Sequence, residues 1–301
     1  MELVTIATKH PIYFKMAVSL LRSVFHWSPN TSAAITLVTD LDEQLPPDLA
    51  DRVRIVPPRK DLEGHIAKLA LYDLTVASSV IFLDADSLCI KPIDSLYSKL
   101  AGNPFVVFGD SVQDGHWWCE VAATCKRFGV RSLPRFYGEF YYFERNKIVQ
   151  DIFRAAITLA ADYDKLGFHR NRGHCNEELL FSITMAQAGL NVQPLPSPIT
   201  NPDRDGFISK LNSRRGSIRV LKSGELSIQS GPNGPSVVHF FASGSNLSPV
   251  YRREMFRINM CAHAVPGFVV DALASFLYVS LRLLTLFRRL RSYLPTLKPG
   301  R

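Results

Sequence analysis

The sequence predicts an α/β fold in which helices cover both faces of a mixed, mainly parallel sheet. Two observations support this prediction. Apolar, strand-like runs alternate with amphipathic, helix-spaced stretches through the first half of the chain, and this alternation is typical of α/β domains. The 301 residues also have an ordinary globular composition, 47% hydrophobic and 21% charged, so the chain can bury a sizeable core without disulfides.

Short apolar runs mark the expected strands of the first half, and helix-spaced apolar residues mark the helices between them. The expected strands are residues 3–7, 34–38, 53–56, 80–83 and 105–108. The expected helices are residues 13–25 and 66–76. Because ligands of such sheets bind beyond the carboxyl ends of the strands, we expect a functional site at that edge.

The second half of the chain is less regular. Residues 196–236 are rich in Pro, Asn, Ser, Arg and Gly, which predicts loops and one small hairpin that pairs 218–221 with 226–228. Long irregular segments of this kind often cover a binding site. The remaining expected elements are an aromatic-rich strand at 136–143, helices at 148–162 and 177–188, and a strand at 236–241.

The last segment, residues 263–301, is expected to form a basic, apolar helical tail that follows a domain spanning residues 1–262. Asp271, Ser275, Arg282 and Arg289 fall roughly along one helical stripe and leave a broad apolar face. This pattern is typical of an amphipathic helix that lies in the surface of an anionic bilayer. A helix packed on the domain or on a second copy is the alternative. A membrane span needs about 20 apolar residues, and Asp271 and Arg282 interrupt any such window.

The net charge of +8 favours anionic partners. The excess lies largely after Arg252, where only Glu254 and Asp271 oppose it. No basic face is interleaved with aromatic residues, which argues against a nucleic-acid partner. Five scattered cysteines without a Cys-x-x-Cys pair indicate reduced thiols, and the first residues lack a signal-peptide pattern. We therefore expect a cytoplasmic protein, peripheral on the inner face of a membrane.

The most informative segment is the apolar run at 80–83 followed by Asp84, Ala85 and Asp86. Two acids at the end of a buried strand are costly without a partner, and carboxylate oxygens suit Mg²⁺ or Mn²⁺ shared with a diphosphate. Such a cation neutralises a leaving phosphate as a Lewis acid. The alternative is that both acids only cap the turn toward Pro92.

The stretch KLALYDLTVASSVIFLDADSLCIKP at 68–92 resembles the donor-binding core of the glycogenin-like, family-8 glycosyltransferases. The opening VTIATKHPIYFKMAVSLLRSV and the later VVHF at 237–240 resemble the first strand and helix and the late His-containing strand of that family. The resemblance covers roughly residues 3–245 and is weak between 110 and 236. It implies a single Rossmann-like GT-A domain, a UDP-sugar donor, Mn²⁺ (or Mg²⁺) and retention of anomeric configuration. The acceptor would be a glycan, a lipid-linked sugar or a protein.

The resemblance also assigns residues. It implies that Asp84, Asp86 and His239 bind the metal, and neutral imidazole is a plausible Mn²⁺ ligand. The residues expected to contact the donor are Thr8, Tyr13, Lys68, Asp84 and Ala85. Lys68 would meet the diphosphate or the sugar, and Tyr13 the base. A core histidine, a solvent-facing lysine and a packing tyrosine are the alternatives at His239, Lys68 and Tyr13.

The sequence departs from the family pattern in places that bear on catalysis. The family's Asp-Gln pair aligns with Asn176 and Glu177. Glu177 is therefore the acid to test, with Asn176 or Glu178 beside it, although acids are also favoured in the first turn of a helix. The family's Lys-Pro-Trp motif is replaced by FFASGSNL at 240–247, which has no lysine.

Other residues are candidates for the missing contacts. Arg252 or Arg253 is a possible substitute for the missing lysine. The family's Asn-Ser-Gly strand aligns with residues 136–139, where its pattern is blurred. Trp117 and Trp118 are candidates to stack on an acceptor sugar, with buried aromatic packing as the alternative.

Two other functions are alternatives to sugar transfer. A non-catalytic membrane-surface module that kept a transferase fold would also lack the lysine motif, since fold does not prove function. A phosphatase of the haloacid dehalogenase type uses Asp-x-Asp with its first acid as nucleophile, but its motif opens on the first strand. In this sequence several expected strands and two expected helices precede Asp84.

Overall fold

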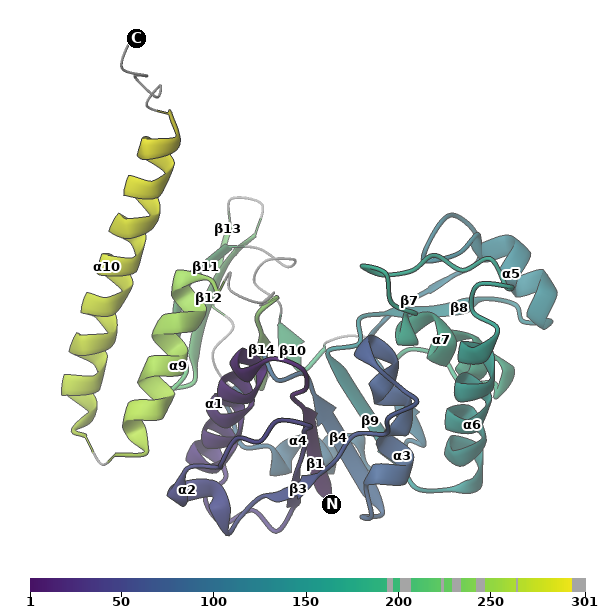
Figure 1. Cartoon of the computed structure of the whole chain (residues 1–301), viewed down its shortest axis with the longest axis horizontal. Coiled ribbons are helices and arrows are strands. Elements are labelled where there is room, and N and C mark those ends of the chain that lie inside the picture. Colours follow the sequence, from purple (N-terminus) through teal and green to yellow (C-terminus); the bar gives the residue numbers. More distant parts are fainter. Residues whose placement is uncertain are drawn as a thin grey trace.

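The computed structural model describes residues 1–193, 197–200, 207–222, 225–228, 234–241, 247–263 and 265–293. Its central sheet is mixed and mainly parallel, as predicted (Figure 1). The strand order is β3 (Arg54–Val56), β2 (Ala34–Val38), β1 (Glu2–Ile6), β4 (Ser79–Leu83), β9 (Phe140–Glu144) and β6 (Phe105–Val106). The first four strands are parallel, and β9 runs antiparallel to both β4 and β6.

The strands alternate their side chains between two hydrophobic cores, one on each face of the sheet. Leu3 and Ile81 enter one core, whereas Val4 and Phe82 enter the other, as the period of two in a strand requires. On the first face lie α1 (Pro11–Trp27), α2 (Pro47–Ala50), α4 (Asp94–Leu100) and α9 (Pro249–Cys261). On the second face lie α3 (Leu71–Leu74), α5 (Val121–Phe128), α6 (Lys147–Ala161) and α7 (Glu177–Gln187). Helices on both faces are therefore confirmed.

The helix expected at 66–76 differs from the prediction. The chain forms a 3₁₀ helix, η1 (Gly64–Ala70), which passes into the short α3. Local apolar spacing predicts an α-helix, whereas the observed tighter turn places the Lys68 side chain inside the protein, between the carboxylates of Asp84 and Glu177. Stretches of 3₁₀ helix of this kind often lie at functional positions.

Two smaller sheets border the carboxyl end of the central sheet. In one, β14 (Val237–His239) pairs antiparallel with β5 (Ser87–Cys89) and parallel with β10 (Ile199–Thr200). In the other, β12 (Ser217–Lys222) lies between β11 (Phe207–Asn212) and β13 (Glu225–Ile228). The pairing of Leu221 with Leu226 confirms the predicted hairpin. Parts of the irregular stretch 196–236, and residues 242–246 of the segment FFASGSNL, lie outside the described residues.

The aromatic stretch at 136–143 splits into two elements. Phe136 ends β8 (Leu133–Phe136), which pairs with β7 (Gly109–Val112), and β9 begins at Phe140. The three residues between them form a turn that comes close to the end of β4, because β9 pairs with β4 in a register that places Phe140 opposite Leu83. This turn contributes to the site described below.

A long helix, α10 (Gly267–Tyr293), follows α9 and packs beside it (Figure 1). Val270 and Ala274 are buried, whereas Phe268 and Phe276 are 76% and 74% exposed. Within the described part of the chain, the stretch Gly267–Phe287 is long and apolar enough to cross a membrane by length and composition, with a mean hydropathy of 1.7. A boundary between a domain at 1–262 and a tail at 263–301 stays a prediction.

Candidate active site

The site begins where β4 ends. Val80, Ile81, Phe82 and Leu83 are fully buried, and the backbone turns immediately after them. The Ser87 amide donates to the Asp84 carbonyl (3.0 Å), which closes this turn. Ala85 points into the core with 6% exposure, so the two acids that flank it are directed to the edge of the sheet. The side chains of Asp84 and Asp86 are 28% and 15% exposed.

His239 completes this group from β14, a strand far away in the sequence. The pairing of His239 with Ser87, and the hydrogen bond from the Phe240 amide to the Asp86 carbonyl (3.0 Å), bring the strand against the turn. The His239 Nε2 atom lies 2.9 Å from Asp86 Oδ1 and 3.9 Å from Asp84 Oδ2. The structure therefore brings Asp84, Asp86 and His239 together, and metal binding by the three stays a prediction.

The donor set of this group fits a divalent cation. One ligand atom from each of Asp84, Asp86 and His239 lies within 4.8 Å of the others, and oxygen with imidazole nitrogen suits Mn²⁺ or Mg²⁺. Burial alone lowers the pKa of His239, but Asp86, Glu139 and Asp84 outweigh it and raise the pKa to about 9. The surrounding carboxylates thus favour positive charge at this point, which a cation site requires.

Lys68 reaches the same group from η1. Its Nζ atom lies 3.0 Å from Asp84 Oδ1 and 2.9 Å from Glu177 Oε1, and donates to the Gly138 carbonyl (2.8 Å). Burial lowers the pKa of Lys68, but Asp84 and Glu177 raise it well above the usual range, so the amine is charged. The alternative of a solvent-facing lysine is wrong. Contact with a diphosphate stays a prediction.

Glu177 and Glu178 begin α7 and point into the site together. Glu177 accepts from Lys68 and from the Tyr141 hydroxyl (3.3 Å), whereas Glu178 accepts from the Gly138 amide (2.8 Å) and the Trp118 indole (3.2 Å). Burial and the neighbouring Glu177 raise the pKa of Glu178 to about 7. One carboxylate is therefore paired with a cation, and its neighbour is held by neutral N–H donors.

The other predicted site residues lie as follows. Asn176 is the N-cap of α7 and accepts from the Leu179 amide (3.0 Å), so its side chain has a structural task. Tyr13 is half-buried on the first core, with its ring at the edge of His10 (6.3 Å between centroids). Thr8 lies just beyond the end of β1 and is partly exposed. Donor contacts by Thr8, Tyr13 and Ala85, and a catalytic role of Asn176, stay predictions.

Two residues of the site were not assigned from the sequence. Glu139 is 6% exposed, and its Oε2 atom lies 3.5 Å from His239 Nδ1. At Gly138, an added Cβ would lie 2.4 Å from Glu177 Oε1 and 2.7 Å from the Tyr141 hydroxyl, so any larger residue would displace these side chains. The sequence signal for Glu139 is its position directly before the aromatic strand. This signal indicates a site residue only once the pairing of that strand with β4 is known.

The remaining candidates lie around this core. Trp117 and Trp118 are half-buried, Trp117 at the edge of Phe136 (6.2 Å between centroids), so both also serve packing. Arg253 donates to Glu254 (2.6 Å) and to the Leu211 carbonyl (3.0 Å). These bonds direct it toward the connection with α10, which disfavours it as a substitute for the missing lysine. Arg252 is exposed.

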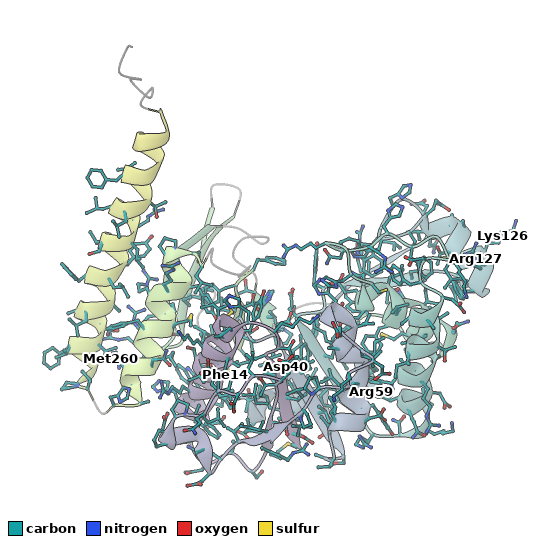
Figure 2. All side chains as sticks on the ribbon, in the orientation of Figure 1. Phe14, Asp40, Arg59, Lys126, Arg127 and Met260 are labelled. Carbon is teal, nitrogen blue, oxygen red and sulfur yellow. The ribbon has the colours of Figure 1, made fainter. Side chains whose placement is uncertain are left out.

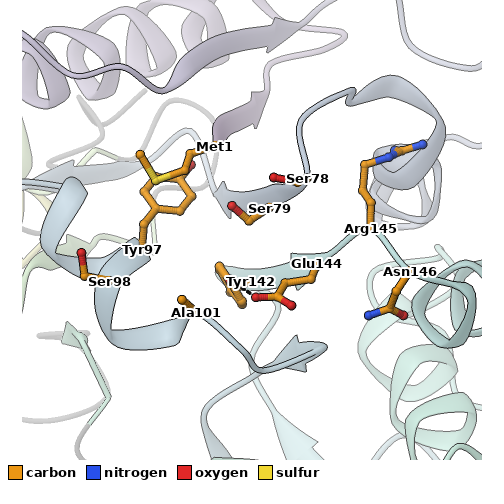
Figure 3. A pocket seen from close by; sticks show the side chains of 10 residues that line it. All are labelled: Met1, Ser78, Ser79, Tyr97, Ser98, Ala101, Tyr142, Glu144, Arg145 and Asn146. Carbon is orange, nitrogen blue, oxygen red and sulfur yellow. Dashed lines mark hydrogen bonds between the residues drawn. The ribbon is translucent and has the colours of Figure 1, made fainter.

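A separate cavity of about 520 Å³ lies at the opposite end of the sheet, where β4 begins and β9 ends (Figure 3). Two of its charged side chains already serve the fold. Arg145 donates to the carbonyls of Tyr72 and Thr75, and Glu144 accepts from Tyr142 (2.8 Å) and the Gly102 amide (2.7 Å). Ligands of mainly parallel sheets bind at the carboxyl ends of the strands, so the group around Asp84 is the better candidate for chemistry.

No protein-family model and no curated protein sequence matches the chain. Solved structures do resemble it. The galactosyltransferase LgtC in complex with donor and acceptor sugar analogues superposes with a TM-score of 0.53 at 13% identity, over 88% of this chain and 98% of LgtC. A glutamine-to-glutamate active-site mutant of LgtC gives 0.55 at 14% identity over the same shares. The bifunctional glycosyltransferase WbbM gives 0.53 at 13% identity, over 90% of this chain and 51% of WbbM. The chain therefore has the fold of the GT-A glycosyltransferases.

Proposed function

We propose that the protein is a metal-dependent glycosyltransferase that moves a hexose from a UDP-sugar to an acceptor hydroxyl with retention of configuration. The observation that carries this proposal is the convergence of Asp84, Asp86 and His239 at the carboxyl end of the sheet in a GT-A fold. LgtC, which shares the fold, has been solved with donor and acceptor sugar analogues. The specific membership in family 8 rests on the sequence resemblance.

Asp84, Asp86 and His239 are the residues that would hold Mn²⁺ or Mg²⁺. When bound, the cation neutralises the negative charge of the leaving diphosphate. Lys68 adds a fixed positive charge beside Asp84, close to where that negative charge develops. Thr8 follows β1 and Ala85 follows β4, so both lie at the same edge of the sheet as the metal group. This position and the family resemblance together support contacts of the donor with Thr8, Tyr13 and Ala85.

The carboxylate of Glu177 is the candidate catalytic group. Lys68 and Tyr141 fix its position, and a negative charge there stabilises the positive charge that develops on the sugar as its bond to the phosphate breaks. The acceptor oxygen forms the new bond to the same carbon from the same face. The proton of the acceptor hydroxyl passes to the departing diphosphate oxygen, so atoms and charges balance without a further base.

The exposed apolar face of α10 supports a location at a membrane surface. Phe268, Phe276, Val279 and Phe287 are 55–76% exposed, and the sequence adds Arg288, Arg289 and Arg291 at the end of the helix. Apolar residues next to basic ones match an anionic bilayer. We propose that α10 docks the enzyme on the cytoplasmic face, where the acceptor is a lipid-linked or envelope glycan. Unchanged membrane association after deletion of residues 267–301 would remove this idea.

The non-catalytic alternative predicts a different binding behaviour. A scaffold that kept only the fold needs neither metal nor nucleotide, whereas a transferase binds UDP in the presence of Mn²⁺. The phosphatase alternative is disfavoured, because Asp84 follows the fourth strand of the chain rather than the first.

Calorimetric titration of UDP with and without Mn²⁺ tests the proposal. The wild-type protein is expected to bind UDP only with Mn²⁺, and Asp86→Ala is expected to lose this binding. Asp151→Ala, which removes an exposed acid on α6, is the matched control and should bind as the wild type does. Metal-independent binding, or none in the wild type, would contradict the proposal. A screen of UDP-sugars for hydrolysis then identifies the donor.

A further inference from the structure

A second ionic cluster lies between α9 and α10, away from the metal group. Glu254 on α9 is fully buried and accepts from the Ser213 amide and hydroxyl, both at 2.9 Å. It also accepts from Arg253 (2.6 Å) and Arg257. The guanidinium of Arg257, itself 4% exposed, donates in turn to Asp271 on α10 (3.0 Å). Arg257 therefore links the two helices through charged hydrogen bonds.

Asp271 has further hydrogen-bond and ion-pair partners at the end of β11 and in the turn between β11 and β12. It accepts from Arg214 (2.6 Å) and Asn212 (3.1 Å), and Arg215 lies 3.0 Å from the same carboxylate. Gly267, the first residue of α10, permits this approach, because an added Cβ would lie 2.7 Å from the Arg214 guanidinium. The first turns of α10 are thus attached from two sides.

The turn that carries Arg214 is itself fixed to the domain. The Trp27 indole at the end of α1 donates to the Ser213 carbonyl (2.9 Å). Gly216 adopts a positive φ of 62° and lies so close to Trp27 and the Ile90 carbonyl that no Cβ fits. A continuous set of contacts therefore runs from α1 through this turn and α9 to Asp271.

The same contacts set the rotation of α10 about its own axis. Val270 and Ala274 face the domain, and Tyr278 packs under the guanidinium of Arg253 (4.6 Å). The apolar residues at 268, 276, 279 and 287 consequently face away from α9. Figure 1 shows that α10 continues past α9 and that its last turns extend beyond the domain, on the side toward which the parallel strands run. Side chains project from the outer face of this helix (Figure 2).

We infer that the ionic cluster of Arg214, Glu254, Arg257 and Asp271 makes α10 a rigid arm, which holds the domain in one orientation on an anionic bilayer. The inference rests on the proposed membrane location, but rigidity of the arm is a property of the free protein. Carboxylates that satisfy several buried cations are costly to remove, because the remaining charges lose their partner. A helix attached only by apolar contacts would tilt and rotate about its connection to α9. These four residues act as positioning residues and take no part in the chemistry.

Hydrogen exchange of the free protein tests rigidity. Asp271→Ala is expected to raise amide exchange in residues 270–280 at least about tenfold, since local opening governs exchange. Asp151→Ala, the same change in an exposed ion pair, should leave this segment unchanged. If Asp271→Ala fails to fold, Tyr278→Ala removes a contact of the arm without stranding a buried charge, and should also raise exchange. Unchanged exchange in a folded variant would overturn the inference.

Fluorescence energy transfer between the protein and a labelled lipid tests the orientation of the domain on the bilayer. A dye introduced at Lys99, an exposed position on α4, reports the distance of the domain from a labelled lipid in phosphatidylglycerol–phosphatidylcholine vesicles. The wild type should give a single, narrow energy-transfer efficiency, and Asp271→Ala should shift or broaden it. The affinity for vesicles and the Mn²⁺-dependent binding of UDP should stay unchanged in this variant. An unshifted efficiency would contradict the inference. Failure of the wild type to bind vesicles would instead reject the membrane location, and hydrogen exchange would still decide whether the arm is rigid.

Discussion

Two ionic clusters of this protein are built from the same kinds of charged side chain, but acids outnumber bases in one and bases outnumber acids in the other. In the first, five acids surround two cationic side chains, Lys68 and His239; the acids are Asp84, Asp86, Glu139, Glu177 and Glu178. In the second, two acids, Glu254 and Asp271, are surrounded by four arginines, Arg214, Arg215, Arg253 and Arg257.

The difference in balance indicates what each cluster does. An excess of carboxylates is unfavourable unless a cation joins them, so the first cluster is suited to a metal ion and a reaction. In the second, each acid has several donors, and those of Asp271 come from β11, from the turn after it and from α9, so the cluster holds α10 to the domain. Its remaining positive charge suits an anionic surface nearby.

The largest expected effect comes from removing an acid from the arginine-rich cluster. Glu254→Gln should lower the free energy of unfolding by about 3–5 kcal/mol, because the buried Arg253 and Arg257 lose their partner. Urea denaturation measures the change. Asp151→Asn, the same substitution in an exposed pair, should change it by less than about 0.5 kcal/mol. A loss below 1 kcal/mol (about fivefold in the equilibrium constant) for Glu254→Gln would show that the cluster contributes little.

In the acid-rich cluster, Glu178 should make the protein less stable as the pH rises. An acid in a salt bridge has the opposite effect, since it stabilises the folded state as the pH rises. The pKa of Glu178 is raised from 4.5 to about 7, so the folded state holds a proton that the unfolded state releases. Stability from this group is therefore complete below pH 4.5, falls as the pH rises to 7, and is constant above. The total is at most about 3 kcal/mol. The stability difference between the wild type and Glu178→Gln, measured by urea denaturation at several pH values, isolates this group. A difference that rises with pH would refute the assignment.

A substitution at Glu177 tests whether catalysis and donor binding use different residues of the same cluster. Glu177→Gln keeps the shape but removes the charge, and should lower the rate of UDP-sugar hydrolysis or transfer about 100-fold. The Kd for UDP with Mn²⁺ should change less than threefold (about 0.7 kcal/mol). Steady-state kinetics and calorimetry measure the two quantities. Equal losses in both would mean that Glu177 maintains the donor site and does not act on the reacting sugar.

The smallest effect is expected at Glu139, which contacts His239 from behind. Glu139→Gln should weaken Mn²⁺ binding about tenfold, because a carboxylate next to a ligating imidazole orients it and raises its basicity. Calorimetric titration of Mn²⁺ in the presence of UDP measures this. Glu144→Gln, at the other end of β9, is the control. Identical Mn²⁺ affinity in both variants would remove Glu139 from the metal site.

The sequence by itself determined most of the fold and the centre of the site. Alternation of apolar runs located β1, β2, β3 and β4 to within one or two residues. Burial on both faces produces such runs in β1, β2 and β4, whereas β3 is an edge strand with an exposed Ile55. A charged site after β4 was predictable, because two carboxylates at the end of a buried strand are costly without a positively charged partner. His239 was added by resemblance, since a lone histidine on an apolar strand carries no local signal.

The tertiary structure alone decided which groups meet these acids. Glu139 and Gly138 enter the site only because β9 pairs antiparallel with β4. Lys68 becomes buried only because η1 packs against α7. The position of α10 depends on Asp271, Arg257 and Arg214, which are 14 to 57 residues apart. Local patterns record which side chains must be buried, whereas the partner of a buried charge is set by strand register and helix packing, which no local pattern contains.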